Sequence, residues 1–460
     1  MLAAFVLMSV ASLAGAVQDD RYGRGSAPAW VLVDIPAHSA PAAAEATDGV
    51  EYLAVDRQIR LTSRGSETYT RIVQRLVSEA GVDEASSMTF DFDPHSDRIT
   101  LHAVKLLRDG QVVEQLGRAR ETVMQREDGL ESGLLDGTLT LSLLLEDVRP
   151  GDVIDYSYTL HHYDEVLGNR YFDSLTTQWS NPVAWSRVRL LQPVDRKLTI
   201  QLHGMDATPV IATHGDLKET TWVWRNLAGI PGESERPDWH ILYPRLRMSE
   251  WRNWSEVVQW GLAEYSNDRA TPRLQHQIEQ WRGLSAAEQI VSAVRFVQDQ
   301  VRYTGIEIGP GAYRPTDPDR VLERRYGDCK DKVLLLTALL RALGIDANPA
   351  LVNTSMLDRL DTVLPSPGVF DHAIVRIRHE GATYWFDATS SLQGGSLESM
   401  AQAHYGSALV IAPGVTTLES IPPMVKPEPT IDVVEKFDLR KGVRGVGSLE
   451  VTTTYLGASA

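Results

Sequence analysis

The sequence predicts a multidomain α+β protein with a β-rich N-terminal half, a mixed core and a further β segment at the C-terminal end. The prediction rests on changes along the chain in the spacing of apolar residues. From about residue 50 to residue 240, short runs that alternate apolar and polar residues are separated by turn residues, which is typical of antiparallel strands. Near residue 250 the apolar spacing becomes helical, and beyond residue 370 two short strand-like runs follow.

The composition is that of an acidic globular chain. Of the 460 residues, 43% are hydrophobic and 23% are charged, and 61 Asp and Glu outnumber 45 Lys and Arg. The net charge is −16, and no run rich in Lys or Arg is present. Because binding to a phosphate backbone requires a basic surface, we expect no nucleic-acid partner.

The first sixteen residues resemble a secretory signal peptide. Leu2 to Ala14 is apolar, ends in the small-residue sequence Ala14-Gly15-Ala16, and is followed by the polar Gln18-Asp19-Asp20. The stretch is too short to cross a bilayer stably. An uncleaved anchor or a buried apolar segment is the alternative. We expect residues 1–16 to be removed, which leaves a mature chain with no stable transmembrane span in the periplasm or at the cell envelope.

A tether and a β-rich domain are predicted next. Residues 17–48 are rich in Ala and Pro, which indicates a tether with little structure of its own. Residues 49–240 carry the alternating runs, and Asp109-Gly110 between two of them is a strong signal for a hairpin turn. We expect this domain to be an antiparallel β-sandwich or a rolled antiparallel sheet.

Two motifs at the edge of this domain are interpreted as structural. The adjacent His161 and His162 point to opposite faces of a strand, so they cannot easily share a metal ion, and no metal site is expected. The aromatic residues Trp251, Trp254 and Trp260 could line a groove for a glycan or a peptide. We expect them instead to pack a helix onto the β-rich domain.

Residues 245–415 are predicted to form the core that carries the chemistry. Helical spacing covers 254–265 and 286–301. A third helix is capped by Asp328, begins at Cys329 and ends before Gly344. Because this helix is apolar almost all round, we expect it to be buried.

Two strands and a C-terminal segment follow. The strands cover 373–378 and 383–387 and are joined around Glu380-Gly381. Residues 416–460 contain a proline-rich linker and then, from 437 to 457, what resembles the opening hairpin of a further β domain. That segment has too few strands to close a core, so the C-terminal domain is expected to be incomplete.

Cys329 is the only cysteine, so it cannot form a disulfide within the chain or a site of several thiolates. A lone cysteine is often a small core residue. At the first position of a helix, however, free N–H groups and the helix dipole favour the thiolate, which is the nucleophilic form, and Lys330 adds a positive charge.

His372 and Asp387 are predicted to lie side by side on the two strands. A two-residue turn at Glu380-Gly381 places Ile374 opposite Asp387, and His372 opposite Thr389. Since side chains alternate with period two, His372 and Asp387 then share one face as diagonal neighbours. A turn that is one residue longer would move Asp387 to the other face.

Together these residues form a candidate Cys-His-Asp triad. Cys329 is the nucleophile, His372 the base and then the acid, and Asp387 the group that orients the imidazole. The alternatives are a core histidine at 372 and an Asx turn at the strand end for Asp387.

Three ordered blocks resemble the bacterial transglutaminase-like superfamily. They are Tyr326-Gly327-Asp328-Cys329-Lys330-Asp331-Lys332, Phe370-Asp371-His372-Ala373 and Trp385-Phe386-Asp387-Ala388-Thr389. The β-rich half resembles the domain of unknown function that often precedes such cores in exported bacterial proteins. The resemblance covers roughly residues 245–415 and implies a papain-like fold with acyl transfer at a thiol. It implies no cofactor. Dependence on calcium is not implied either, because the sequence contains no EF-hand-like loop.

One feature of that family is missing. Better-known transglutaminases use an upstream tryptophan to donate to the oxyanion, but this chain has no tryptophan between Trp281 and Trp385. Tyr303 or Tyr313 is therefore the candidate donor beside the N–H of Cys329.

We predict thiol-dependent acyl transfer or amide hydrolysis on a peptide or protein substrate, which includes peptidase and deamidase activity. A cell-envelope component is a second class of partner. The alternative function is a catalytically inactive transglutaminase-fold binding module in the cell envelope. The sequence does not define an oligomeric state.

Overall fold

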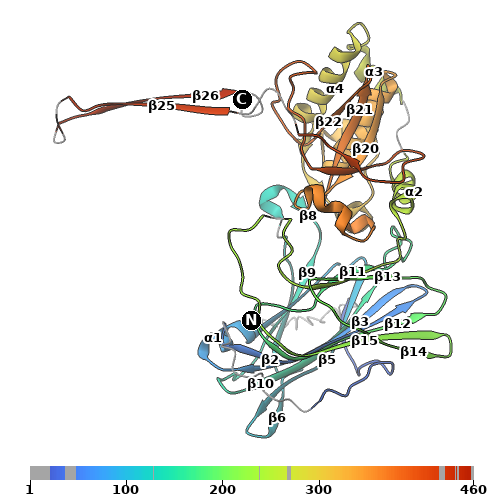
Figure 1. Cartoon of the computed structure of the whole chain (residues 1–460), viewed down its shortest axis with the longest axis vertical. Coiled ribbons are helices and arrows are strands. Elements are labelled where there is room, and N and C mark those ends of the chain that lie inside the picture. The colour runs from blue at the N-terminus through green and yellow to red at the C-terminus, as the bar shows by residue number, and fades with distance from the viewer. Residues whose placement is uncertain are drawn as a thin grey trace, which may run out of the picture.

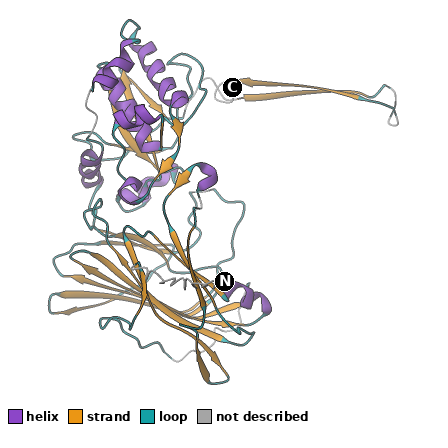
Figure 2. Cartoon of the chain, turned by 180° about the vertical axis from the view of Figure 1, so that it is seen from behind, coloured by secondary structure: helices purple, strands orange, loops and turns teal. Residues whose placement is uncertain are grey.

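The computed structural model describes residues 21–36, 48–127, 129–237, 239–266, 271–423, 430–440, 442 and 445–456. A β-rich part and a mixed part lie one above the other along the long axis of the molecule (Figure 1). Apart from α1, the α-helices gather in the mixed part (Figure 2). The predicted signal peptide, residues 1–16, lies outside the described residues.

The β-rich part is built on one nine-stranded sheet. Its strand order is β1-β5-β10-β3-β2-β12-β15-β14, with β6 paired to β5. The strands are β1 (Tyr22–Arg24), β2 (Val50–Thr62), β3 (Gly65–Leu76), β5 (Asp97–Arg108), β6 (Gln111–Glu114), β10 (Val153–His162), β12 (Val183–Pro193), β14 (Val210–His214) and β15 (Leu217–Leu227). The predicted turn at Asp109-Gly110 is confirmed, because Arg108 pairs with Gln111 and both turn residues have positive φ.

This sheet is mixed, although an antiparallel one was expected. β12 pairs with β2 in the parallel direction, and β1 pairs with β5 in the same way. The chain reaches β12 by a long connection after the β2–β3 hairpin, and so it can lie beside β2 in the same direction.

Two three-stranded sheets pack on the large one and make the domain sandwich-like. The first has the order β4-β9-β7 and the second the order β11-β16-β13. These strands are β4 (Ser87–Phe92), β7 (Arg120–Gln125), β9 (Leu139–Leu144), β11 (Phe172–Thr176), β13 (Thr199–His203) and β16 (Arg245–Ser249). Each sheet closes its own apolar core, with Leu141 buried in the first and Leu246 in the second.

The segment expected to be a tether is partly held against this domain. β1 adds to the sheet, and Val31 is buried. The buried side chain of Gln58 bonds both the N–H and the C=O of Leu32, at 2.9 and 2.8 Å. Residues 21–36 thus follow the sheet surface instead of forming a free linker, because buried polar groups of the sheet satisfy their backbone.

The mixed part has helices around one buried helix. They are α2 (Trp254–Glu264), α3 (Pro272–Glu279), α4 (Ala286–Gln300), α5 (Pro318–Arg324) and α6 (Cys329–Ala342), whereas α1 (Glu79–Ala85) belongs to the β-rich part. α6 is buried from Cys329 to Leu340, as its apolar pattern predicts, and α3, α4 and α5 pack around it. Gly344, with φ +82°, follows its C-terminal end.

An antiparallel sheet of five strands packs against α6. Its order is β22-β21-β20-β23-β24. The strands are β20 (Asp346–Val352), β21 (His372–His379), β22 (Ala382–Phe386), β23 (Ser407–Val410) and β24 (Glu419–Ser420). The predicted register of β21 and β22 is confirmed: His379 pairs with Ala382 around Glu380-Gly381, both of positive φ.

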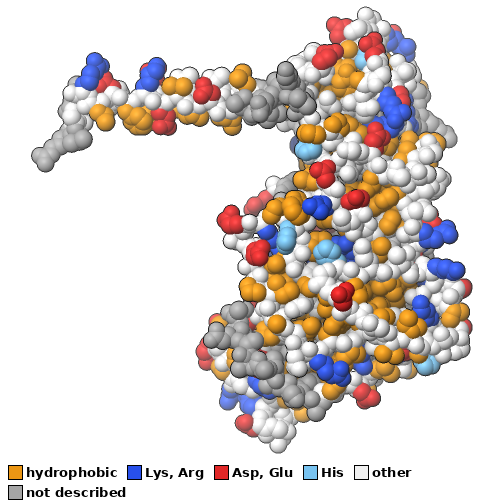
Figure 3. Space-filling model, viewed as in Figure 1, with side chains coloured by type: hydrophobic (Ala, Val, Ile, Leu, Met, Phe, Trp, Pro, Cys, Tyr) orange, Lys and Arg blue, Asp and Glu red, His pale blue; other side chains and the backbone are white. Residues whose placement is uncertain are grey.

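The C-terminal segment is a projecting hairpin of β25 (Thr430–Asp438) and β26 (Ser448–Leu456) (Figure 1). Its first strand begins earlier than the predicted residue 437. Apolar side chains such as Val433 and Phe437 are exposed along it (Figure 3). Among the described residues, the helices lack the length and the apolar character that a membrane span needs.

Candidate active site

The site begins at the first residue of α6, where Cys329 is buried and only 8% exposed. Asp328 caps the helix by accepting from the N–H of Asp331 at 3.0 Å, and Asp331 accepts from the N–H of Asp328 in return. Arg324 and the N–H of Thr316 also bond the carboxylate of Asp331. This double cap fixes the helix start, so the dipole acts on the sulfur from a rigid position.

Gly327 permits this cap for a steric reason. A Cβ atom at this residue would lie 2.6 Å from the Cβ of Asp331, which is closer than two such atoms can approach. The glycine just before Asp328 therefore lets the chain turn tightly into the helix.

Lys330 is paired with carboxylates beside the cysteine. Its ammonium lies 2.6 Å from Asp328 and 3.0 Å from Glu307. Burial lowers the pKa of Lys330, but Asp328, Glu307 and Cys329 outweigh it and hold that pKa above its usual range. Lys330 therefore stays charged, and its positive charge is shared between the two carboxylates and the cysteine.

His372 and Asp387 are in direct contact. Nε2 of His372 lies 2.9 Å from Oδ2 of Asp387. The confirmed register explains this contact, because both residues stand just at the ends of the paired strands and on the same face. Burial raises the pKa of Asp387, but bonds to His372, Thr389 and Tyr405 outweigh it and hold the pKa well below the usual range.

Cys329 is the second partner of the imidazole. Burial disfavours the charged ring, but the hydrogen bonds of His372 with Asp387 and Cys329 raise its pKa to about 10. Since Nε2 faces Asp387, Nδ1 is the ring nitrogen left for the sulfur. The structure therefore places His372 in contact with Asp387, and Cys329 acts on the pKa of the same imidazole.

The carboxylate of Asp387 is held by four donors. Oδ1 accepts from the N–H of Thr389 at 2.7 Å and from its hydroxyl at 2.6 Å. Oδ2 accepts from His372 and, at 2.7 Å, from the hydroxyl of Tyr405. The Asx-type turn and the contact with His372 thus occur together, on different oxygens of one side chain.

The two tyrosines proposed for the oxyanion lie in different surroundings. Tyr303 is half-buried, and its pKa is raised first by burial and then by the charge of Cys329, so this ring is near the sulfur. Burial, and after it the charge of Asp164, raise the pKa of Tyr313 to about 12. The ring of Tyr313 meets that of Trp260 edge-on, with centroids 6.0 Å apart. Of the two, Tyr303 is the one whose pKa the charge of Cys329 raises.

A buried lysine ties α6 to α4 behind the site. Nζ of Lys332 donates to the carbonyls of Val301 at 2.7 Å and Gln298 at 3.3 Å, where α4 ends. The amide of Gln298 in turn donates to the backbone carbonyl of Asp387 at 2.8 Å. Burial lowers the pKa of Lys332 to about 8. This chain of bonds links the helix that carries Cys329 to the strand end that carries Asp387.

A segment of the β-rich part also pairs with a strand close to Tyr303. β8 (Leu134–Leu135) pairs with β18 (Gly305–Ile306), which follows Tyr303. A Cβ atom at Gly305 would lie 2.3 Å from the side chain of Leu134, so a larger residue here would displace that side chain.

Trp251 and Trp260 contact the β-rich part, as the sequence predicts, whereas Trp254 meets Phe370 of the mixed part at 5.7 Å. Trp251 meets Trp260 edge-on at 6.3 Å, and Trp260 donates to the carbonyl of Val166 at 2.9 Å. The guanidinium of Arg170 lies over Trp251 at 3.8 Å.

His161 and His162 contact different carboxylates. His162 lies 2.7 Å from Asp97, and His161 lies 3.7 Å from Glu67. Within the described ranges, no group of three or more His, Cys, Asp or Glu side chains is arranged to hold a metal ion.

Two family models match the chain. Residues 63–231 match DUF3857, a domain of unknown function that has a solved structure, and residues 274–388 match the transglutaminase-like superfamily. The second range includes Cys329, His372 and Asp387. The chain therefore carries a core of the transglutaminase-like superfamily, with a papain-like fold, preceded by a DUF3857 domain.

A solved bacterial structure has a similar fold over most of the chain. A crystal structure from Parabacteroides distasonis, described as a "putative protease", is 16% identical, has a TM-score of 0.64 and covers 81% of this chain and 72% of its own. At this identity the similarity shows the fold alone.

Two other structures are more distant. An M1 zinc metallopeptidase from Deinococcus radiodurans has a TM-score of 0.25 at 13% identity and covers 44% of this chain and 43% of its own. A "putative cysteine protease" from Cytophaga hutchinsonii has a TM-score of 0.18 at 12% identity, over 85% of this chain and 90% of its own. No argument rests on either, and no curated protein matches the sequence.

Sequence reasoning missed the supports of the site. Thr389 had a local signal, because a hydroxyl two residues after Asp387 is typical of an Asx-type turn. Tyr405 had none, since it comes 18 residues after Asp387 and reaches it through the fold. The pairing of Lys330 with Glu307 likewise joins α6 to a segment that lies 23 residues earlier in the chain.

Proposed function

We propose that this protein is a cysteine acyltransferase or amidase that acts on amide bonds of peptides or proteins. The observation that supports the proposal is the contact of His372 with Asp387 at 2.9 Å, on an imidazole whose pKa Cys329 also raises. The transglutaminase-like superfamily match supports the same chemistry. No cofactor is part of the proposal.

The first half-reaction forms a thioester. With a pKa raised to about 10, His372 is protonated at neutral pH, donates Nε2–H to Asp387 and turns Nδ1–H toward the sulfur. The thiolate attacks the amide carbonyl, and a C–S bond forms while the carbonyl π electrons move to oxygen. As that oxyanion collapses, the C–N bond breaks, and His372 gives its Nδ1 proton to the leaving amine or ammonia.

The second half-reaction releases the acyl group. Water or an amine attacks the thioester, and the neutral His372 accepts the proton of the attacking group at Nδ1. The C–S bond breaks, and the thiolate leaves and pairs again with the imidazolium. In both halves the N–H of Cys329, at the unpaired end of α6, and the hydroxyl of Tyr303 are the proposed donors to the oxyanion.

The acceptor distinguishes hydrolysis from transfer. We would incubate the protein with a glutamine-containing peptide, with and without a labelled primary amine, and follow ammonia release and label incorporation. Ammonia without label indicates deamidation, label indicates transfer, and a shortened peptide indicates peptidase activity.

Cys329→Ala is the decisive variant. We expect it to lose all turnover while its melting temperature stays close to that of the parent, because only a sulfur is removed from a buried site. Turnover in the variant would sink the proposal. If neither protein turns over any substrate, but both bind the same partner, the binding module becomes the better assignment.

Export to the periplasm or the envelope stays a prediction. N-terminal sequencing of the protein recovered from the envelope fraction tests it. A chain that starts after Ala16 supports cleavage, and a chain that starts at Met1 contradicts it.

A further inference from the structure

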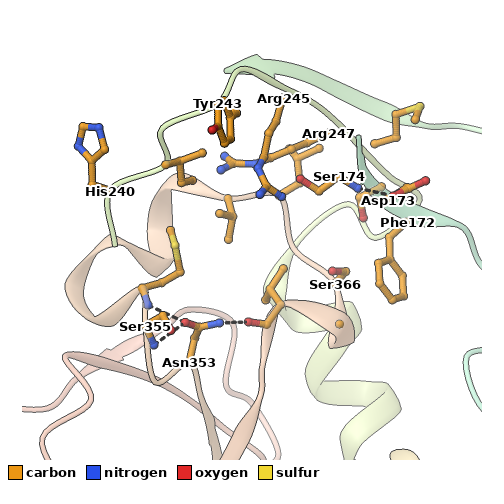
Figure 4. Close-up of a pocket in the computed structure, with 18 of the residues that line it drawn as sticks. Phe172, Asp173, Ser174, His240, Tyr243, Arg245, Arg247, Asn353, Ser355 and Ser366 are labelled. Carbon is orange, nitrogen blue, oxygen red and sulfur yellow. Dashed lines mark hydrogen bonds between the residues drawn. The ribbon is translucent and has the colours of Figure 1, made fainter. Parts of the chain in front are cut away.

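A cavity of about 650 Å³ lies between the β-rich part and the mixed part. One wall comes from β11, β16 and the loop that precedes β16, and the other comes from the segments on either side of η3 (Leu357–Thr362). Figure 4 shows Arg245 and Arg247 on the first wall and Asn353 and Ser355 on the second. Such a cavity between two domains is a common location for a ligand site.

The alternation along β16 places its arginines in this cavity. Leu246 and Met248 are buried in the apolar core of the β-rich part. Arg245, Arg247 and Ser249 stand on the opposite face and line the cavity. The strand therefore presents two guanidinium groups on the face turned toward the mixed part.

No carboxylate neutralises these two groups within the described part of the chain. Arg247 is 5% exposed and bonds only neutral oxygens, the carbonyl of Thr362 at 3.1 Å and Oε1 of Gln201 at 3.3 Å. Nε of Arg245 is buried and has no hydrogen-bond partner there. A buried charge beside a half-buried like charge, with no counter-charge, is costly, so this arrangement favours an anion between them.

Among the described residues that line the cavity, Asp173 is the one carboxylate, and it is already used. Asp173 accepts from the hydroxyl of Tyr171 at 3.0 Å and from the N–H of Ser174 at 2.6 Å. Burial raises the pKa of Asp173 above its usual range. The other charged side chains among the described lining residues are Arg236, Arg245 and Arg247, so this described lining is positive in a chain of net charge −16.

The neighbouring histidine responds to this positive field. His203 pairs with Arg245 across β13 and β16. Its pKa is lowered first by burial and then by the charges of Arg247, Arg245 and His240. The field is thus not cancelled by side chains around it.

The cavity is close to the candidate active site. Val352 pairs with His372, and Asn353, the next residue, lines the cavity. Adjacent Cα atoms are 3.8 Å apart and paired Cα atoms about 5 Å apart, so the backbone of His372 lies within about 10 Å of this wall.

We propose that this cavity binds an anionic oxygen group, a carboxylate or a phosphate, with the guanidinium groups of Arg245 and Arg247 as its partners. Planar guanidinium forks match either group with paired N–H donors. The proposal concerns binding alone and holds whether or not Cys329 is a nucleophile.

The test is ligand-induced stabilisation of the full chain. We would measure the melting temperature against the concentration of inorganic phosphate and, separately, of N-acetylglutamate, with sodium chloride at matched ionic strength as the reference. A ligand that binds the folded state raises the melting temperature in proportion to the logarithm of its concentration above Kd. The anion that acts at the lower concentration identifies the phosphate or the carboxylate as the natural group.

Arg245→Gln is the informative variant, because no described residue bonds its side chain and its basal melting temperature should not fall. We expect it to lose at least tenfold in affinity for the anion, and Arg245→Lys to keep part of it. Arg225→Gln, an exposed arginine on β15, removes the same charge away from the cavity and should behave like the parent. No stabilisation by either anion, or equal stabilisation of the parent and Arg245→Gln, would overturn the proposal.

Discussion

The hydroxyl of Tyr405 donates to Oδ2 of Asp387 at 2.7 Å. The same oxygen receives Nε2 of His372, and the rings of Tyr405 and His372 meet edge-on with centroids 5.6 Å apart. Tyr405 therefore fixes both the carboxylate and the plane of the imidazole that it orients. In the proposed reaction it is a positioning residue, because it reaches the reacting atoms only through Asp387.

We expect Tyr405→Phe to lower kcat about tenfold and to leave KM nearly unchanged. A hydrogen bond to a charged group contributes about 1.5–3 kcal/mol, and a tenfold loss corresponds to about 1.4 kcal/mol of that. The measurement is steady-state kinetics on a peptide substrate from the glutamine assay. Tyr384→Phe is the control, because no described residue bonds its hydroxyl. A change in KM alone would contradict a positioning role.

Asp387→Asn should change the pH dependence of cysteine alkylation. Because Cys329 is the only cysteine, iodoacetamide reports on this residue alone. We expect an upper inflection near pH 10 in the parent, where the imidazolium of His372 loses its proton. Removing the carboxylate charge should move this inflection down toward the ordinary histidine pKa of about 6.5. An unchanged inflection would mean that Asp387 does not stabilise the imidazolium.

Stability should fall with rising pH on account of His372. Its folded pKa of about 10 lies above the ordinary value of 6.5, so the folded state holds the proton more tightly than the unfolded chain. This contribution is complete below about pH 6.5 and is lost as the pH rises to 10. We expect the difference in free energy of unfolding between the parent and His372→Gln to shrink over that window in urea titrations.

The same comparison also cancels the contribution of Lys332, which titrates in this pH range as well. Lys332 has a folded pKa of about 8, below its ordinary 10.5, and so it adds stability as the pH rises from 8 to 10.5. Both proteins contain Lys332, and its effect cancels in the difference. A difference that stays constant from pH 6 to 10 would show that His372 is not held in its charged form.

The sequence predicts best where local rules decide the structure. Asp328 and Gly344 mark the ends of α6, and Glu380-Gly381 fixes the register that joins His372 to Asp387. A cap needs only a few adjacent residues, and a two-residue turn determines which side chains share a face.

Contacts between distant segments could not be predicted in this way. Tyr405 approaches Asp387 only after β23 has joined the sheet, and the parallel pairing of β12 with β2 depends on a long connection. The alternation of polar and apolar residues from Arg245 to Ser249 is visible in the sequence. It shows which face of the strand is apolar, but it does not show which segment packs against the polar face. The second wall of that cavity begins at Asn353, and its position opposite β16 depends on the tertiary structure.

Lys332→Met should lower the free energy of unfolding by about 2–4 kcal/mol. Methionine keeps an unbranched side chain that is one atom shorter, but the carbonyls of Val301 and Gln298 lose their buried donor. Each unsatisfied group costs about 1–3 kcal/mol. The loss is offset in part because a charged amine no longer has to be buried.

Urea unfolding at pH 7 measures this loss of stability, with Lys197→Met as the control, since Lys197 is exposed on the β-rich part. Because Gln298 also holds the carbonyl of Asp387, we expect Cys329 alkylation to slow in the variant as well. Equal stability of the two variants would mean that the bonds of Lys332 do not tie α6 to α4.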